Sequence, residues 1–270
     1  MAALSSLRET LDVIFAAIYR GESIATMDFS DRPYAEMVAF MHKYICFIIE
    51  YPTLQAASEY DRTYMYRELK AYLLGMMQQT EDNTVYASQT SWNTWHSPAS
   101  SYLKWVRTLG SDHVSGFSSS AFFFCHLSPN GEVFPSPELK FIAQDCVSHI
   151  SVLCRIWNDW GSMTRDIAER NINGMNFPEF RGMDEQEVKI HMRHISDYER
   201  RCLHKALEEL RDTACSQMGE KCGTSWFDAF SLFFRGAEVY NSIYEFKDIS
   251  AWKLSLVAAS SREANGHGLV

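Results

Sequence analysis

Residues 158–166 read Asn158-Asp159-Trp160-Gly161-Ser162-Met163-Thr164-Arg165-Asp166, inside a long helical pattern that begins near Ser136. Asn158, Ser162 and Asp166 are each four residues apart, and at 3.6 residues per turn a step of four drifts only about 40° around the helix axis. The spacing therefore predicts an amide, a hydroxyl and a carboxylate on one stripe of one helix. Such oxygen ligands suit Mg²⁺, which leaves other coordination positions to water and phosphate oxygens.

Asn and Ser are unfavourable in the middle of a helix, because their side chains compete for backbone hydrogen bonds. Asn158 and Ser162 nevertheless share one stripe of an otherwise apolar helix. This placement indicates a binding function for the stripe. A polar helix face that binds no ligand is the alternative interpretation.

The pattern Asn-Asp-x-x-Ser-x-x-x-Asp resembles the second metal motif of class I terpene synthases. In that family the Asn, the Ser or Thr and the last acid hold one Mg²⁺ against a prenyl diphosphate. Further segments are similar to the C-terminal class I domain of fungal bifunctional diterpene synthases, the copalyl diphosphate/kaurene synthase type: 81–83, 105–108, 112–113, 154–162, 165–169, 171–173, 176–180, 240–244 and 247–249. The resemblance runs from about Asp61 to Trp252, and only the part around 154–180 is specific by itself.

The resemblance implies an all-α, class I terpene synthase-like helical bundle. Apolar residues recur at helical spacing, with no defensible strand alternation, repeat or linker, in segments 5–20, 33–50, 60–79, 99–109, 114–126, 136–173, 184–218, 223–245 and 248–259. We therefore expect one domain over 1–259 and a frayed polar tail over 260–270.

By the same resemblance, Asn158, Ser162 and Asp166 would bind Mg²⁺. Arg107 is expected to sense the diphosphate and take part in catalysis, and Arg165, next to the acid, is a second diphosphate contact.

Two further candidates lie about eighty residues downstream of Asn158. Arg235 and Tyr240 stand where many of these enzymes carry an Arg and a Tyr that contact diphosphate. For each Arg of the predicted site, a surface ion pair worth ~0–1 kcal/mol is the alternative.

A helix break is expected between Asp112 and Ser118, where Gly116 and several hydroxyl residues adjoin. In the family, a broken helix at this place lines the substrate pocket. A loop followed by a core helix is the alternative.

The sequence departs from the family in one respect. Residues 1–270 contain no Asp-Asp-x-x-Asp run or acidic variant of it. The family's spacing would place that first metal motif near or before the first helix, which offers only Glu9 and Asp12 as a reduced metal site. The bundle is therefore expected to be N-terminally shortened, a fragment, or completed by a homodimer or another partner.

Composition narrows the function classes. Apolar residues make up 46% and aromatic residues 14%, which suffices for a large core or an aromatic pocket. The net charge is −9 without a run of Lys or Arg, which argues against nucleic-acid binding. Seven scattered cysteines, no signal peptide and no apolar run of about 20 residues favour a cytoplasmic protein without a membrane span.

These observations predict a class I terpene cyclase that ionises an acyclic prenyl diphosphate with Mg²⁺ and cyclises the carbocation to a terpene hydrocarbon. Farnesyl diphosphate is favoured because the domain is small, and the alternative substrates are geranylgeranyl diphosphate or copalyl diphosphate made by another enzyme. A catalytically inactive helical binding or assembly module is the alternative, and prenyl transfer to another acceptor stays open.

Overall fold

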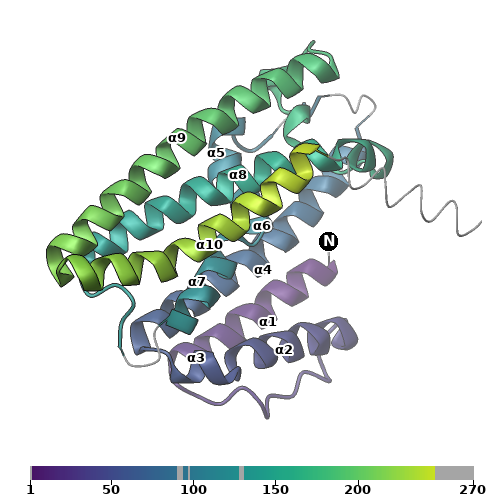
Figure 1. The fold of residues 1–270 in the computed structure, drawn as a ribbon. Coiled ribbons are helices and arrows are strands. Elements are labelled where there is room, and N and C mark those ends of the chain that lie inside the picture. Colours follow the sequence, from purple (N-terminus) through teal and green to yellow (C-terminus); the bar gives the residue numbers. More distant parts are fainter. Residues whose placement is uncertain (1, 90–93, 97, 128–130, 247–270) are drawn as a thin grey trace, which may run out of the picture.

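The computed structural model describes residues 2–89, 94–96, 98–127 and 131–246. In this part of the chain all regular elements are helices, which confirms the predicted all-α class (Figure 1). The α-helices are α1 (Ala2–Tyr19), α2 (Ala35–Ile49), α3 (Pro52–Ala56), α4 (Glu59–Ala87), α5 (Tyr102–Arg107), α6 (Leu109–His113), α7 (Gly116–Leu127), α8 (Pro137–Glu169), α9 (Glu185–Met218) and α10 (Glu220–Phe246). Two short 3₁₀ helices, Gly174–Asn176 and Pro178–Phe180, follow α8.

The long helix α8 forms the axis of the bundle, and its ends follow from local sequence. Ser136 caps its N-terminus by accepting the N–H of Leu139, and Pro137 occupies the first turn, where no N–H is needed. The helix stops at Glu169 because Arg170 adopts a left-handed conformation with φ 55°. The predicted continuation to residue 173 is therefore wrong: Asn171 donates its N–H to the carbonyl of Asp166 and the chain turns away.

Helices α9 and α10 form a hairpin that packs on α8, whereas α1, α2 and α3 form the opposite edge of the molecule (Figure 1). Helix α4 packs between α1 and the pair α6 and α7. Gly219, with φ 83°, makes the turn between α9 and α10. The predicted segment 248–259 and tail 260–270 lie outside the described residues.

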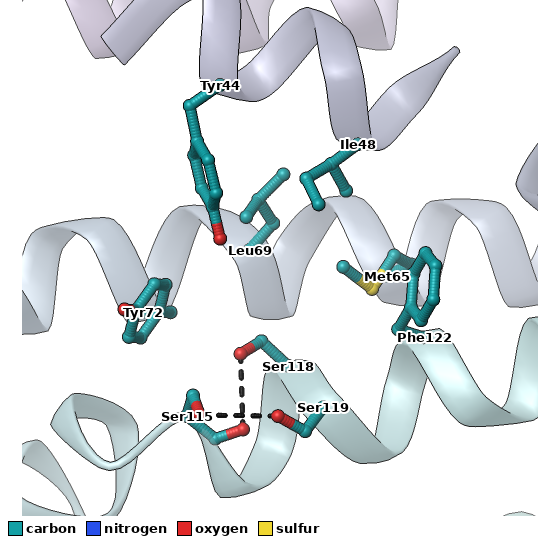
Figure 2. A pocket seen from close by; sticks show the side chains of 9 residues that line it. All are labelled: Tyr44, Ile48, Met65, Leu69, Tyr72, Ser115, Ser118, Ser119 and Phe122. Carbon is teal, nitrogen blue, oxygen red and sulfur yellow. Dashed lines mark hydrogen bonds between the residues drawn. The ribbon is translucent and has the colours of Figure 1, made fainter. Parts of the chain in front are cut away.

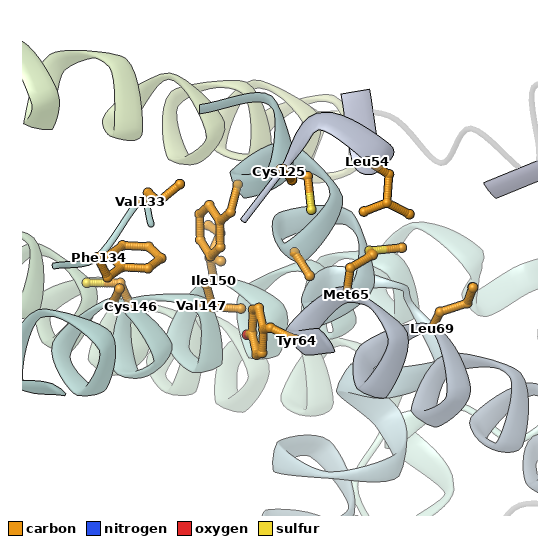
Figure 3. Close-up of a cluster of buried hydrophobic side chains, with 14 of the residues drawn as sticks. Leu54, Tyr64, Met65, Leu69, Cys125, Val133, Phe134, Cys146, Val147 and Ile150 are labelled. Atoms are coloured by element: carbon orange, nitrogen blue, oxygen red, sulfur yellow. The ribbon is translucent and has the colours of Figure 1, made fainter. Parts of the chain in front are cut away.

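The main core joins buried side chains from α1 to α4, α7, α8, α9 and α10. Figure 3 shows the part of it where α4, α7 and α8 meet Val133 and Phe134. A second core joins Trp105 and Tyr102 of α5 to Phe177 and to the C-terminal half of α8. The rings of Trp105 and Phe177 lie 4.8 Å apart between centroids. This second core fixes the segment after α8 against the stripe that carries Asn158, Ser162 and Asp166. Within the described residues, none of the helices is long and apolar enough to cross a bilayer.

Candidate functional site

The predicted stripe forms on the C-terminal half of α8. Asn158 is half-buried, whereas Ser162 and Asp166 are 1% and 4% exposed. The Ser162 hydroxyl donates to Oδ2 of Asp166 at 2.5 Å. The amide, hydroxyl and carboxylate thus share one face, as the four-residue spacing requires.

The carboxylate of Asp166 is held from three sides. Besides Ser162, Asn173 donates from Nδ2 to Oδ2 at 2.9 Å. Arg165 donates to Oδ1 from Nη2 at 3.1 Å and from Nε at 3.3 Å. Arg165 is therefore brought to the stripe as predicted, but as a partner of Asp166, with its side chain 43% exposed.

Helix α10 covers the other side of the stripe. Tyr240 shares a side-chain hydrogen bond with Asn158, and burial raises the pKa of its phenol. Its ring lies 4.7 Å from that of Tyr244, which rests where a Cβ on Gly161 would stand. A glycine at position 161 is thus what lets α10 approach α8 here. Tyr240 therefore lies beside the stripe, and its contact with diphosphate stays a prediction.

Beside the stripe lies a buried ion pair to which the sequence reasoning assigned no role. Arg155, 2% exposed, donates to Oδ1 of Asp159, which is fully buried. Oδ2 of Asp159 accepts the N–H of Gly174 at 3.0 Å, and its carbonyl accepts Nδ2 of Asn173 at 2.7 Å. Asp159 therefore fastens the segment after α8, including Asn173, the residue that holds Asp166.

The helix break meets α8 at this ion pair. Arg155 donates from Nη1 to Nδ1 of His113 at 3.0 Å and stacks over the Trp105 ring at 4.7 Å. Burial, then Arg155 and Arg165, lowers the pKa of His113 to about 3, so its imidazole is neutral near pH 7. Burial, helped by the Asp166 carboxylate, raises the pKa of Asp159 to about 6 against the opposing effect of Arg155.

The break itself lies where it was predicted. Helix α6 ends at His113, Ser115 has φ 61°, and α7 begins at Gly116. A pocket of about 280 Å³ adjoins this break and is lined from α2, α4 and α7 by Tyr44, Ile48, Met65, Leu69, Tyr72, Ser115, Ser118, Ser119 and Phe122 (Figure 2). Serine hydroxyls line one side of this pocket. Ser118 donates to the carbonyl of Ser115, and the hydroxyls of Ser115 and Ser119 lie 3.2 Å apart.

Arg107 is not placed for the predicted diphosphate contact. Its guanidinium pairs with Oε1 of Glu199 on α9, and Oε2 of Glu199 lies 2.6 Å from Nδ1 of His149. His149 precedes Asn158 by nine residues, which is about 13 Å along a helix at 1.5 Å per residue. Sequence could not reveal this pairing, because Glu199 follows Arg107 by 92 residues.

Arg235 also lies apart from the stripe. It is exposed and donates back to its own helix, to the carbonyl of Asp228 and the hydroxyl of Ser231. The predicted role of Arg235 as a diphosphate contact is therefore not supported by its position.

Glu9 and Asp12, the predicted reduced metal site, each lie beside a basic side chain. Each carboxylate meets a cation from a different segment: Glu9 lies 3.7 Å from Arg32, and Asp12 lies 2.7 Å from Lys70. Across the described ranges there is no cluster of three or more His, Cys, Asp or Glu side chains suited to a metal. A cation at the stripe would therefore depend on one carboxylate, Asp166, and on neutral oxygens.

The chain is similar in sequence to fungal diterpene synthases. It is 31% identical to ent-kaur-16-ene synthase of Fusarium fujikuroi over 218 residues, which are 76% of this chain and 23% of that protein. It is 29% identical to a pimaradiene synthase of Emericella nidulans over 76% of this chain and 21% of that protein. With the bifunctional premutilin synthase of Rhodocybe pseudopiperita it shares 26% identity over 73% of this chain and 22% of that protein.

The chain thus spans less than a quarter of the length of these curated relatives. No protein-family model matches it. A solved structure of a cucumene synthase variant has the same fold, with a TM-score of 0.56 at 13% identity over 88% of this chain and 69% of that one. In sequence and in fold, this chain is class I terpene synthase-like, with fungal diterpene synthases among its homologues.

Proposed function

We propose that the chain is a class I terpene cyclase that binds Mg²⁺ and a prenyl diphosphate at the stripe on α8. The observation that carries this proposal is the shared face of Asn158, Ser162 and Asp166, with Tyr240 and Arg165 beside it. The relatives named as diterpene synthases support the same reaction class.

The residues of the stripe fit a hard cation by donor type. The amide oxygen of Asn158, the hydroxyl of Ser162 and the carboxylate of Asp166 are all oxygen ligands that Mg²⁺ accepts. Asp166 already accepts hydrogen bonds from Ser162 and Asn173. The Ser162 hydroxyl can rotate its proton away and offer a lone pair instead. When bound, Mg²⁺ would neutralise the charge that builds on the leaving diphosphate.

The protein's own residues would then orient the diphosphate and exclude water. Arg165, which is 43% exposed, can turn from Asp166 toward an anion, and Tyr240 can donate its hydroxyl. The neutral His113, fixed by Arg155 at Nδ1, carries its proton on Nε2 and can donate there. Such preorganised donors stabilise the developing anion more than water would.

Farnesyl diphosphate is the favoured substrate and geranylgeranyl diphosphate the second. The pocket beside the helix break, about 280 Å³, is just smaller than the roughly 300–1,000 Å³ common for small-molecule sites. A small pocket favours the shorter hydrocarbon chain, while the names of the relatives favour the C20 class.

A non-catalytic binding module is the second candidate. Two observations favour it. The Asp166 carboxylate already accepts a hydrogen bond from Asn173, and Arg107 and Arg235 have their partners away from Asp166. Such a module would bind Mg²⁺ and diphosphate without forming product.

The test is incubation of the purified chain with each substrate, with and without Mg²⁺, and product analysis by gas chromatography–mass spectrometry. Asp166→Asn keeps the size and much of the hydrogen bonding of Asp166 but removes its charge. Asp212→Asn, on the exposed part of α9, is the matched control. We expect a cyclic product that depends on Mg²⁺. Asp166→Asn should abolish this product, and Asp212→Asn should preserve it. If neither substrate reacts but titration calorimetry detects Mg²⁺-dependent binding of inorganic diphosphate, the protein is a non-catalytic binding module and not a cyclase.

A further inference from the structure

The segment that leaves α8 is tied to α4 by one side chain. Asn83, half-buried on α4, accepts the N–H of Ile172 at Oδ1, with 2.9 Å between the nitrogen and the oxygen. Its Nδ2 donates to Oδ1 of Asn171 at 3.0 Å. Gln79, one turn earlier on α4, donates to Oδ1 of Asn83 at 3.0 Å and steadies the amide. These contacts join two segments that are 88 residues apart in the sequence.

The backbone fixes which way the amides of this segment point. A backbone N–H can only donate, so the Asn83 atom that faces the N–H of Ile172 is the oxygen. Its NH₂ group then faces Asn171, whose side-chain oxygen accepts it. The same reasoning holds for Asn173, because its Oδ1 accepts the N–H of Met175 at 3.2 Å. Each of these amides therefore has one orientation.

Asn173 lies one residue beyond the anchor and carries it to the stripe. It is 1% exposed, and its Nδ2 donates to the carbonyl of Asp159 at 2.7 Å and to Oδ2 of Asp166 at 2.9 Å. Oδ2 of Asp166 is thus held by a buried donor, while Oδ1 faces the half-exposed Arg165. When the Ser162 hydroxyl turns its proton away to offer a lone pair, Asn173 is the buried donor that still holds Oδ2.

The anchor has to come from another helix, because residues 171–173 belong to none. Ile172 is 2% exposed, and without Asn83 its N–H would be buried with no acceptor. The segment would shift to satisfy that N–H, and Asn173 would move with it. Binding groups have to be held to within about 0.5 Å of their working geometry. Loss of the outer partner of a metal ligand typically weakens metal affinity about 10–100-fold.

We propose that Asn83 is a positioning residue for Asp166: it anchors the segment that follows α8 and, through Asn173, holds the Asp166 carboxylate in the orientation that binds Mg²⁺. This inference rests on the proposed function, because it concerns Mg²⁺ binding at the stripe. Asn83 acts through Asn173 and is not itself a ligand. Its loss should therefore raise the Mg²⁺ concentration that diphosphate binding needs, while the helices stay in place.

The experiment is titration calorimetry of the purified full chain with inorganic diphosphate at a series of Mg²⁺ concentrations, which gives the half-saturating Mg²⁺ concentration. Asn83→Leu keeps the size of the side chain and removes its amide, and it should raise that concentration about fivefold. Asn83→Asp keeps the acceptor for Ile172 and should stay within about twofold of wild type. Ser136→Ala is the matched control, because it removes the cap at the other end of α8 and should leave the half-saturating concentration unchanged. Far-UV circular dichroism checks that each variant is folded.

Two further measurements show whether Asn83 acts through Asn173. Asn173→Ala should raise the half-saturating Mg²⁺ concentration about tenfold, and adding Asn83→Leu to it should raise the concentration by less than about twofold more. Hydrogen–deuterium exchange without Mg²⁺, followed by mass spectrometry, tests the anchor independently of ligand binding. Exchange in the peptide that spans residues 170–176 should be faster in Asn83→Leu than in wild type, and unchanged in Ser136→Ala.

The outcomes separate this inference from the function on which it rests. If wild type shows no Mg²⁺-dependent binding of diphosphate, the proposed function fails and this inference fails with it. If wild type binds but Asn83→Leu has the wild-type Mg²⁺ dependence, or is no different from Ser136→Ala, the positioning role alone is overturned. Full addition of the Asn83 and Asn173 effects, or unchanged exchange over residues 170–176 in Asn83→Leu, would also overturn it.

Discussion

The buried ion pair of Arg155 and Asp159 gives a prediction whose magnitude follows from burial. Replacing Asp159 by Ala leaves the Arg155 guanidinium, 2% exposed, without its carboxylate, and leaves the N–H of Gly174 without an acceptor. Breaking a buried pair by removing one partner costs about 3–5 kcal/mol. That is a large part of a typical folding free energy of about 5–15 kcal/mol, so we expect the melting temperature to fall by about 10 °C.

The assay is urea unfolding followed by circular dichroism, on wild type, Asp159→Ala, Arg155→Leu and the double variant. The double variant should lose less free energy of unfolding than the two single variants added together, because neither charge is then left alone. Asp212→Ala, an exposed acid on α9, should change stability by less than about 0.5 kcal/mol. A loss below about 1 kcal/mol for Asp159→Ala, or strict additivity in the cycle, would refute this account of the pair.

Two further predictions concern His113 and Gly223. The folded-state pKa of His113 is lowered to about 3 from its ordinary 6.5, so between these values the unfolded chain binds more protons and stability falls as the pH falls. Between about pH 7 and about pH 5, the free energy of unfolding measured in urea should fall by about 1–2 kcal/mol less for His113→Gln than for wild type. An equal fall for both proteins would contradict this prediction. A Cβ on Gly223 would lie 2.5 Å from the Cα and 2.6 Å from the N of Cys215 on α9, so Gly223→Ala should destabilise by about 2–3 kcal/mol despite its better helix propensity. Gly236→Ala is the control on the same helix, because no atom lies within 4 Å of the added Cβ. It should stabilise the protein by up to about 1 kcal/mol. Similar melting temperatures for the two variants would contradict the close approach of α10 to α9 at Gly223.

The helices could be predicted from sequence because their signals are local. The apolar spacing along α8 and the cap at Ser136 need only neighbouring residues to be read. The stripe of Asn158, Ser162 and Asp166 follows from helical geometry alone. The break at Ser115 was predicted from the family's pattern and from the adjoining Gly116.

The predictions that the structure does not support concern side chains whose partners are distant in sequence. Arg107 pairs with Glu199, and Asp12 pairs with Lys70. Neither pairing can be predicted from the sequence before the fold is known. The pairing of Arg155 and Asp159, in contrast, has a local signal in the sequence. An Arg and an Asp four residues apart within an apolar helix indicate a pair that is buried together.

The charges around the stripe explain why Mg²⁺ is expected to decide diphosphate binding. Arg155 is matched by Asp159 and Arg165 by Asp166. The neighbouring His113 is neutral near pH 7 because burial and the two arginines lower its pKa to about 3. These groups together carry no net charge, so a diphosphate approaching α8 gains little from the protein alone. A divalent cation at Asn158, Ser162 and Asp166 would change the sign of the local field and free Arg165 from Asp166 to contact the anion. Binding of diphosphate should therefore depend on the cation more steeply than on either arginine.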